Sequence, residues 1–152
     1  MRTIKFRGQR VDTKEWVYGD LIHGQGGKTG KMYILPQTQL YPSGCSELDG
    51  WEVIPETVGQ LTGRTDKNGK EAYDGDVGVR YLDAKKIYTD GKTWKDYWRV
   101  EWYKSGFITV IIADYNVQFG KMVREPYQPN KYSTRFDEIE IFGNIHDNPE
   151  LL

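Results

Sequence analysis

The residues best suited to chemistry in this chain are its two histidines and its single cysteine. His146 is followed directly by Asp147, a carboxylate that could orient the imidazole as a general base. No motif in the sequence supplies a nucleophile for this pair, so we interpret His146 as a structural residue near the C-terminus. A hydrolase that uses His146 and Asp147 is retained as the second alternative function, and the enzyme hypothesis ranks last.

Metal binding has little support in the sequence. Cys45 is the only cysteine, which excludes an intramolecular disulfide and a zinc site made of cysteines from one chain. His23 and His146 do not form a pair on one strand face. Asp74 and Asp76 are too few for a calcium site and suit a turn in which carboxylates accept backbone hydrogen bonds. We therefore expect no metal ion and no catalytic residue.

A glycine-rich segment at residues 23–30 partly matches a phosphate-binding loop. That motif requires a glycine five positions before Gly27, where this chain has Ile22. The loop should also lead into a helix, whereas residues 32–35 followed by Pro36 predict a strand and its end. We interpret the segment as a hairpin tip and expect no nucleotide cofactor.

Binding is better supported than catalysis. The segment from Trp94 to Lys104 is strongly aromatic, and its odd-numbered face combines cations with rings that could stack on bases. Glu101 interrupts this face and opposes phosphate binding. The sequence favours a surface for another protein or a second copy of the chain, with nucleic acid as the alternative partner. The candidate binding residues are Lys95, Tyr97, Arg99 and Tyr103.

The elements that must position these residues are strands. Alternation of apolar and polar residues at residues 4–7, 77–81, 94–103, 107–112 and 135–145 predicts an all-β protein. In the first strand, Ile4 and Phe6 are expected to face the core and Lys5 and Arg7 to face solvent. Residues 116–123 fit either a short strand or one helical turn.

Turn residues separate these strands. Residues 58–62 read as a short strand that leads into Asp66-Lys67-Asn68-Gly69, where Asn68 and Gly69 are expected to supply the positive φ values of a tight hairpin. Tyr73-Asp74-Gly75-Asp76 predicts a wider corner before the next strand. The loop-like composition of residues 36–50 places a domain boundary there, between residues 1–50 and residues 51–152.

Composition limits the functional classes further. The chain has 152 residues, of which 38% are hydrophobic and 14% aromatic, and a formal net charge of −1. Its overall charge therefore gives no general attraction to nucleic acid or to an anionic membrane. The sequence has neither a signal-peptide pattern nor a membrane-length apolar segment. We expect a cytoplasmic protein without a membrane partner.

Several segments resemble the YopX family of bacteriophage and prophage proteins. They are the first hairpin around Ile4-Lys5-Phe6-Arg7-Gly8, the Val100-Glu101-Trp102 segment and, most specifically, the ending Gly143-Asn144-Ile145-His146-Asp147-Asn148-Pro149-Glu150-Leu151-Leu152. The resemblance implies a small N-terminal strand subdomain and an SH3-like C-terminal β-barrel in a phage-encoded protein of a bacterial cell. It implies no reaction, so we expect a non-enzymatic assembly or partner-binding module. We also expect the ending to be structural, with Asn144 and Asn148 bonding their own turn.

Overall fold

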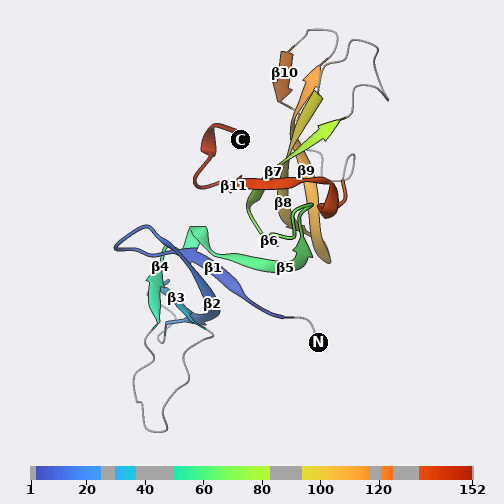
Figure 1. Ribbon diagram of the computed structural model, residues 1–152. Helices are drawn as coiled ribbons and strands as arrows, with labels where there is room; N and C mark the ends of the chain where they lie inside the picture. The colour runs from blue at the N-terminus through green and yellow to red at the C-terminus, as the bar shows by residue number, and fades with distance from the viewer. Residues whose placement is uncertain are drawn as a thin grey trace. The chain divides into compact units, whose positions relative to one another are not determined.

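A computed structural model of the chain describes residues 3–24, 30–36, 50–82, 94–116, 121–124 and 134–151. In this part of the chain the regular elements are β-strands and three short 3-10 turns (Figure 1), which confirms the all-β class. The chain divides into two compact units, residues 1–63 and residues 64–152. The described residues contain no helix of the length and apolarity that a membrane crossing requires.

The N-terminal unit is built from antiparallel strands in the order β4-β3-β2-β1-β5. Backbone hydrogen bonds from Val11 to Glu52, 3.0 Å, and from Ile54 to Gln9, 2.8 Å, tie β4 to the end of β1 as well. The core of this unit contains Val17, Ile34 and Val53. Its elements are β1 (Phe6–Gln9), β2 (Trp16–His23), β3 (Met32–Leu35), β4 (Trp51–Val53), the 3-10 turn η1 (Pro55–Thr57) and the start of β5 (Gly59–Thr65).

The division between the units differs from the boundary at residue 50 expected from composition. Residues 51–53 form β4 and pair with β3, and Gly59 and Gln60 of β5 pair with β1. Backbone pairing therefore joins residues 51–60 to the strands before them. A change in composition marks a loop, but it carries no information about which strands a later segment will pair with.

The expected burial of the first strand is wrong at two positions. Ile4 is 60% exposed, whereas Arg7 is only 6% exposed. β1 is an inner strand, with β2 on one side and β5 on the other, so side chains of neighbouring strands lie beside Arg7 on its face of the sheet. Arg7 is accommodated because its guanidinium lies over the Trp16 ring, 4.8 Å from the ring centroid.

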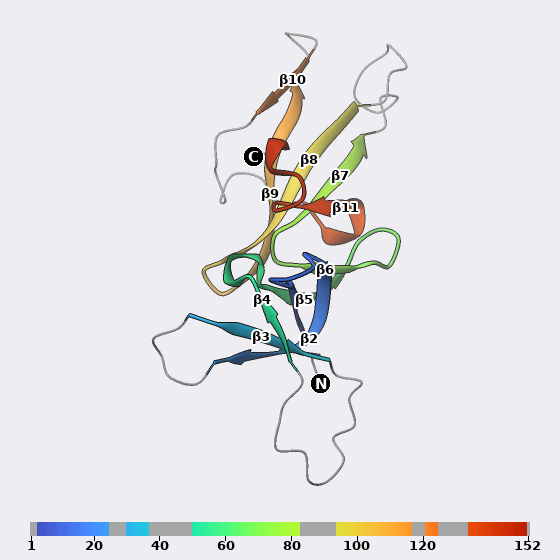
Figure 2. The same cartoon turned by 90° about the vertical axis from the view of Figure 1, so that its left-hand side faces the viewer.

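The C-terminal unit contains a second antiparallel sheet with the strand order β10-β9-β8-β7-β11 (Figure 2). In the described residues no pairing joins β10 to β11, so the strand pairing shows an antiparallel sheet there without showing closure into a barrel. The elements are β6 (Glu71–Tyr73), β7 (Asp76–Leu82), β8 (Trp94–Tyr103), β9 (Gly106–Asn116), β10 (Lys121–Arg124), η2 (Phe136–Glu138), β11 (Glu140–Asn144) and η3 (Pro149–Leu151).

The even-numbered face of β8 faces the core of this unit, as the alternation predicts. Trp98 is 2% exposed and Val100 is fully buried, and both pack in a cluster with Ile139 and Ile141. Trp102 is an exception, because it lies next to the hairpin turn and is exposed. Its ring meets that of Phe107 edge to face, with the ring centroids 4.9 Å apart. Tyr81, expected to alternate with Val77 and Val79 as a buried residue, is also exposed.

The polar residue on this apolar face, Asp96, is fully buried and has partners. Its carboxylate accepts hydrogen bonds from the indole N–H of Trp98 at 2.6 Å and from Nε and NH2 of Arg80 at 3.2 and 2.5 Å. Burial alone would lower the pKa of Arg80, but hydrogen bonding and attraction to Asp96, with a smaller contribution from Glu138, raise it overall. The buried carboxylate of Asp96 therefore has a charged partner, and the ion pair helps to fix β7 against β8.

The hairpin between β5 and β6 has a different turn from the one expected. Gly69 has φ +82°, but Asn68 is not among the described residues with positive φ. The Gly69 N–H donates to the Asp66 carbonyl at 3.0 Å and the Asp66 N–H to the Lys70 carbonyl at 2.9 Å. This arrangement fits a type I turn followed by a left-handed glycine, which needs only one residue of positive φ.

Several expectations fall wholly or partly outside the described residues. These are Cys45, most of the loop at residues 36–50, most of the glycine-rich segment and residues 117–120. Where residues 116–123 are described they are strand, because β9 extends to Asn116 and β10 begins at Lys121. The alternating pattern of residues 135–145 begins with the turn η2 and becomes a strand only at Glu140.

Candidate functional site: an aromatic cavity in the C-terminal unit

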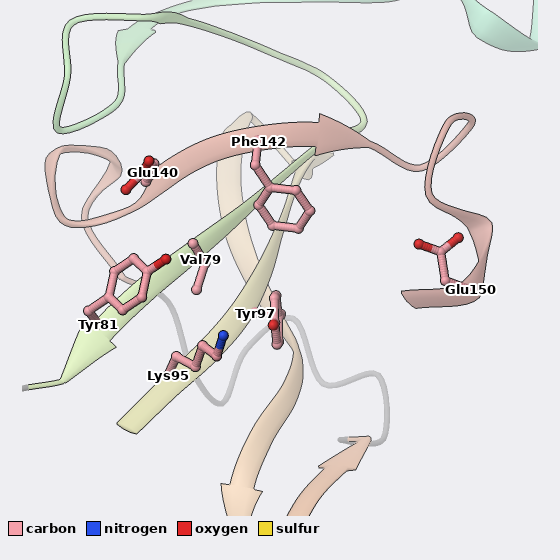
Figure 3. A pocket seen from close by; sticks show the side chains of 7 residues that line it. All are labelled: Val79, Tyr81, Lys95, Tyr97, Glu140, Phe142 and Glu150. Carbon is pink, nitrogen blue, oxygen red and sulfur yellow. The ribbon is translucent and has the colours of Figure 1, made fainter. Parts of the chain in front are cut away.

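Two of the four candidate binding residues, Lys95 and Tyr97, line a cavity of about 270 Å³ in the C-terminal unit (Figure 3). β7, β8, β11 and η3 supply its walls. The lining residues are Val79, Tyr81, Lys95, Tyr97, Glu140, Phe142 and Glu150.

The pairing of β7 with β8 places four of these residues on one face of the sheet. Val79 lies directly opposite Tyr97, and Tyr81 lies directly opposite Lys95. Residues opposite each other in an antiparallel pair project to the same side, so this register gathers their side chains. Val79 is 5% exposed and Tyr81 is 51% exposed, and the wall therefore runs from a buried apolar end to an open aromatic end.

Phe142 lines the cavity from an irregular position in β11. Ile141 pairs with Gly78 and Gly143 pairs with Val77, which leaves Phe142 without an opposite residue. A bulge of this kind can re-aim a side chain. The neighbouring Ile141 is buried in the core, whereas Phe142 is 45% exposed and meets Tyr97 edge to face, with ring centroids 6.0 Å apart.

The open end of the cavity contains a charged pair. Nζ of Lys67 lies 2.7 Å from Oε2 of Glu140 and 4.8 Å from the centroid of the Tyr81 ring. Lys67 comes from the turn between β5 and β6, and its backbone N–H donates to the Ile139 carbonyl at 2.9 Å. The turn therefore supplies a cation that both neutralises Glu140 and holds Tyr81.

Asp66 holds this turn against β11. Its buried carboxylate accepts hydrogen bonds from the backbone N–H groups of Asn68 and Lys70, both at 2.8 Å, and of Ile141 at 3.0 Å. Burial raises the pKa of Asp66, but the three hydrogen bonds, from Ile141, Lys70 and Asn68, and the charge of Lys70 together lower it below its ordinary value. Through Asp66 the turn that contains Lys67 is fixed to the strand that contains Glu140 and Phe142.

The other two candidate residues do not line the cavity. Arg99 lies 2.6 Å from the Glu101 carboxylate, and the side chains of both residues are largely covered. Tyr103 lies beside the β8–β9 turn, where Nζ of Lys104 is 5.2 Å from its ring centroid. Lys95 and Tyr97 thus line the cavity, whereas Arg99 lies outside it and its charge is balanced by Glu101.

The ending around His146 forms a hydrogen-bonded turn. The side-chain oxygen of Asn144 accepts the backbone N–H groups of His146 and Asp147 at 2.9 Å, and its amide nitrogen donates to the Asp147 carboxylate at 2.6 Å. The Asn148 side-chain oxygen accepts the Asn144 N–H at 3.3 Å. These bonds confirm that Asn144 and Asn148 satisfy their own turn, and they give the Asp147 carboxylate a structural partner.

Gly143 leaves room for the Asn148 side chain in this turn. A Cβ atom at this position would lie 1.9 Å from the Asn148 side-chain oxygen, too close for any real contact. The hydrogen-bonded turn at residues 143–148 therefore accounts for Gly143 and for both asparagines of the ending.

Among the described residues no group of three histidine, cysteine, aspartate or glutamate side chains is placed to hold a metal ion. The cavity instead combines an apolar base, three rings and mixed charge, which suits recognition.

Sequence reasoning missed the residues that β11 and η3 contribute. The alternation that placed Ile139 and Ile141 in the core also places Phe142 on the other face of the strand. That face was expected to be polar, so a large aromatic residue on it was the available signal for a binding site. Tyr81 was misplaced as a buried residue. The role of Lys67 had no signal in sequence, because it depends on contacts between segments more than seventy residues apart.

Comparisons with known proteins agree with this architecture. Residues 5–152 match the family model for YopX protein. Protein EF1440 from Enterococcus faecalis, whose crystal structure is known, is similar in fold, with a TM-score of 0.55 and 18% sequence identity. The alignment covers 100% of this chain and 99% of that chain. A comparison of the sequence with curated proteins gave no match.

Proposed function

The chain belongs to the YopX protein family, and from that premise we propose that it is a non-enzymatic module that binds another protein or a second copy of itself. The observation that carries the proposal is the cavity with two large aromatic residues at its surface, Tyr81 and Phe142, which are 51% and 45% exposed.

Exposed aromatic residues that share one cavity are the usual composition of a protein-binding surface. Tyr and Phe are enriched at interfaces because each ring buries a large area and loses little conformational entropy. Covering the exposed half of the Phe142 side chain would contribute about 1 kcal/mol. The mixed charge around the rings suits the polar rim of such a surface.

Two other functions have weaker support. Nucleic acid is the alternative partner, but the only other cation of the candidate face, Arg99, is paired with Glu101, and two glutamates line the cavity. A hydrolase based on His146 and Asp147 would need the Asp147 carboxylate to orient the imidazole, whereas that carboxylate accepts a hydrogen bond from Asn144.

We extend the proposal to the architecture and the location of the protein. An SH3-like arrangement of the C-terminal unit is supported by its strand order, in which four consecutive strands form a meander and the last strand follows a 3-10 turn to pair with the first. A phage-encoded protein working in the cytoplasm of a bacterial cell is the setting that the family suggests.

Site-specific photo-cross-linking tests the proposal. The full chain is made with p-benzoylphenylalanine in place of Phe142, and a control carries the same group in place of Tyr18 of the N-terminal unit, a residue of equal exposure at 44%. Irradiation in a bacterial lysate is expected to give discrete protein adducts from position 142 and not from position 18. Mass spectrometry then tells a second copy from another protein.

Two outcomes would contradict the proposal. One is an equal pattern of adducts from both positions, which would mean that exposure alone explains capture. The other is a position-142 adduct that nuclease treatment removes, which would favour the nucleic-acid alternative.

A further inference from the structure

The charged residues that line the cavity differ in whether the chain itself gives them partners. Glu140 is paired with Lys67 at 2.7 Å. Glu150 has an interaction within the chain. Lys95 is exposed, and within the described ranges its ammonium group has neither a hydrogen bond nor an ion pair. Among the described residues, Lys95 is therefore the charged residue of the lining whose side chain has no partner within the chain.

The size of the cavity limits what can enter it. Pockets for drug-sized ligands measure roughly 300–1,000 Å³, and this cavity, at about 270 Å³, lies just below that range. Tyr97 and Phe142 already meet at an interplanar angle of 76°. A third ring can join two such rings in the same edge-to-face manner. One aromatic side chain is thus a better match than a nucleotide or a cofactor.

We propose, on the basis of the function proposed above, that the cavity binds an acidic aromatic segment of a partner protein. One aromatic side chain of the segment packs against Tyr97 and Phe142, and a carboxylate next to it in the segment pairs with Lys95.

Charge complementarity selects this occupant over others. A cationic ligand would approach the ammonium of Lys95, and a neutral apolar ligand would cover that ammonium without giving it a partner. A nucleic-acid strand would offer phosphates to Lys95, but it would also bring a charge with every nucleotide toward Glu140 and Glu150. A carboxylate beside one aromatic residue can meet Lys95 without the charge that a nucleic acid carries at every nucleotide.

The test uses three blocked tripeptides as probes: acetyl-Glu-Phe-Glu-amide, acetyl-Lys-Phe-Lys-amide and acetyl-Glu-Ala-Glu-amide. Each is titrated into the ¹⁵N-labelled full chain while NMR follows the backbone amides of Lys95, Tyr97 and Phe142. The acidic phenylalanine peptide is expected to shift these amides and to bind about two- to fivefold more tightly than the basic one, the range of one exposed ion pair. The alanine peptide is expected to cause no saturable shift.

A charge reversal gives the decisive comparison. Lys95→Glu is expected to invert the order, so that the basic phenylalanine peptide binds more tightly than the acidic one. Lys14→Glu, the same charge change in an exposed turn of the N-terminal unit, is expected to leave the order unchanged. Both variants alter exposed side chains, and the dispersion of the NMR spectrum verifies that each remains folded.

The proposal is overturned if the unmodified chain prefers the basic peptide, if Lys95→Glu leaves the preference unchanged, or if a short oligothymidine saturates the same amides more readily than the acidic peptide. Cross-linking at position 142 separates this failure from that of the proposed function. Protein adducts that form equally with and without Lys95→Glu would refute the acidic segment and leave the partner-binding function supported.

Discussion

Asp66 is the residue on which the geometry of the cavity depends most. Its carboxylate accepts three backbone hydrogen bonds, one of them from β11, and is only 4% exposed. A hydrogen bond to a charged group contributes roughly 1.5–3 kcal/mol. Asp66→Asn places an N–H group where one acceptor is needed, so we expect it to lower the free energy of unfolding by about that amount, measured by urea denaturation at neutral pH.

The same residue predicts a dependence on pH. The pKa of Asp66 is lower in the folded chain than the value of about 3.9 expected when unfolded, so the unfolded state binds the proton more readily. The contribution of Asp66 to stability is complete well above pH 4 and is lost as pH falls through its folded pKa. The difference in stability between the unmodified chain and Asp66→Asn should therefore shrink on acidification. A difference that stayed constant to pH 2.5 would contradict this assignment.

Asp96 gives the second prediction at the scale of single residues. Removing one partner of a fully buried ion pair costs about 3–5 kcal/mol. After Asp96→Ala the Arg80 guanidinium, 26% exposed, keeps a longer ion pair with Glu138 at 3.6 Å, whereas the buried indole N–H of Trp98 loses its acceptor. We therefore expect a loss in urea-measured stability below that range but well above the effect of a surface charge. Asp137→Ala removes the partner of Arg135 in an exposed pair and should change stability little. Equal effects of the two substitutions would show that Asp96 contributes no more than a surface charge.

Individual elements could be predicted from sequence where alternation and turn chemistry act locally. The strand at residues 32–35 and the Asp12-Thr13-Lys14 turn, where Lys14 has φ +63°, follow from such signals. The burial of Arg7 could not be predicted, because it depends on β5 pairing with β1 from more than fifty residues away. Local pattern predicts which residues form a strand, but not whether that strand has one neighbour or two.

The C-terminal turn provides a prediction at the scale of elements. Asn144 is buried and makes three hydrogen bonds through its side chain, so Asn144→Ala should cost about 1–3 kcal/mol for the unsatisfied backbone groups alone. His146→Ala in the same turn should cost less, roughly 0.5–1.5 kcal/mol, the value of one hydrogen bond. Thermal denaturation compares them. A larger loss from His146→Ala would point to a role for the imidazole that the turn does not explain.

At the scale of the whole molecule, the sequence predicted the class of fold. Two of the four candidate surface residues, Lys95 and Tyr97, also line the cavity, because the alternation of β8 places them on one face. Phe142, Glu140 and Glu150 could not be assigned to the same site, because the pairing of β11 with β7 and the return of the chain to η3 bring them there. When four elements form a site, the sequence reveals only the residues of its most regular strand.

The two units have separate cores, and this leads to a prediction about how the chain opens. Ile34 and Ile139 are both fully buried, the first in the N-terminal cluster and the second in the C-terminal cluster, and the two clusters share no residue. Truncation of either isoleucine to alanine should cost about 2–5 kcal/mol. Native-state hydrogen exchange measures the opening of each segment separately. We expect Ile34→Ala to lower protection in β2 and β3, and Ile139→Ala to lower it in β7 and β8. If either substitution lowered protection equally in all four strands, the chain would open as one cooperative structure, and the separation of the cores would have no energetic counterpart.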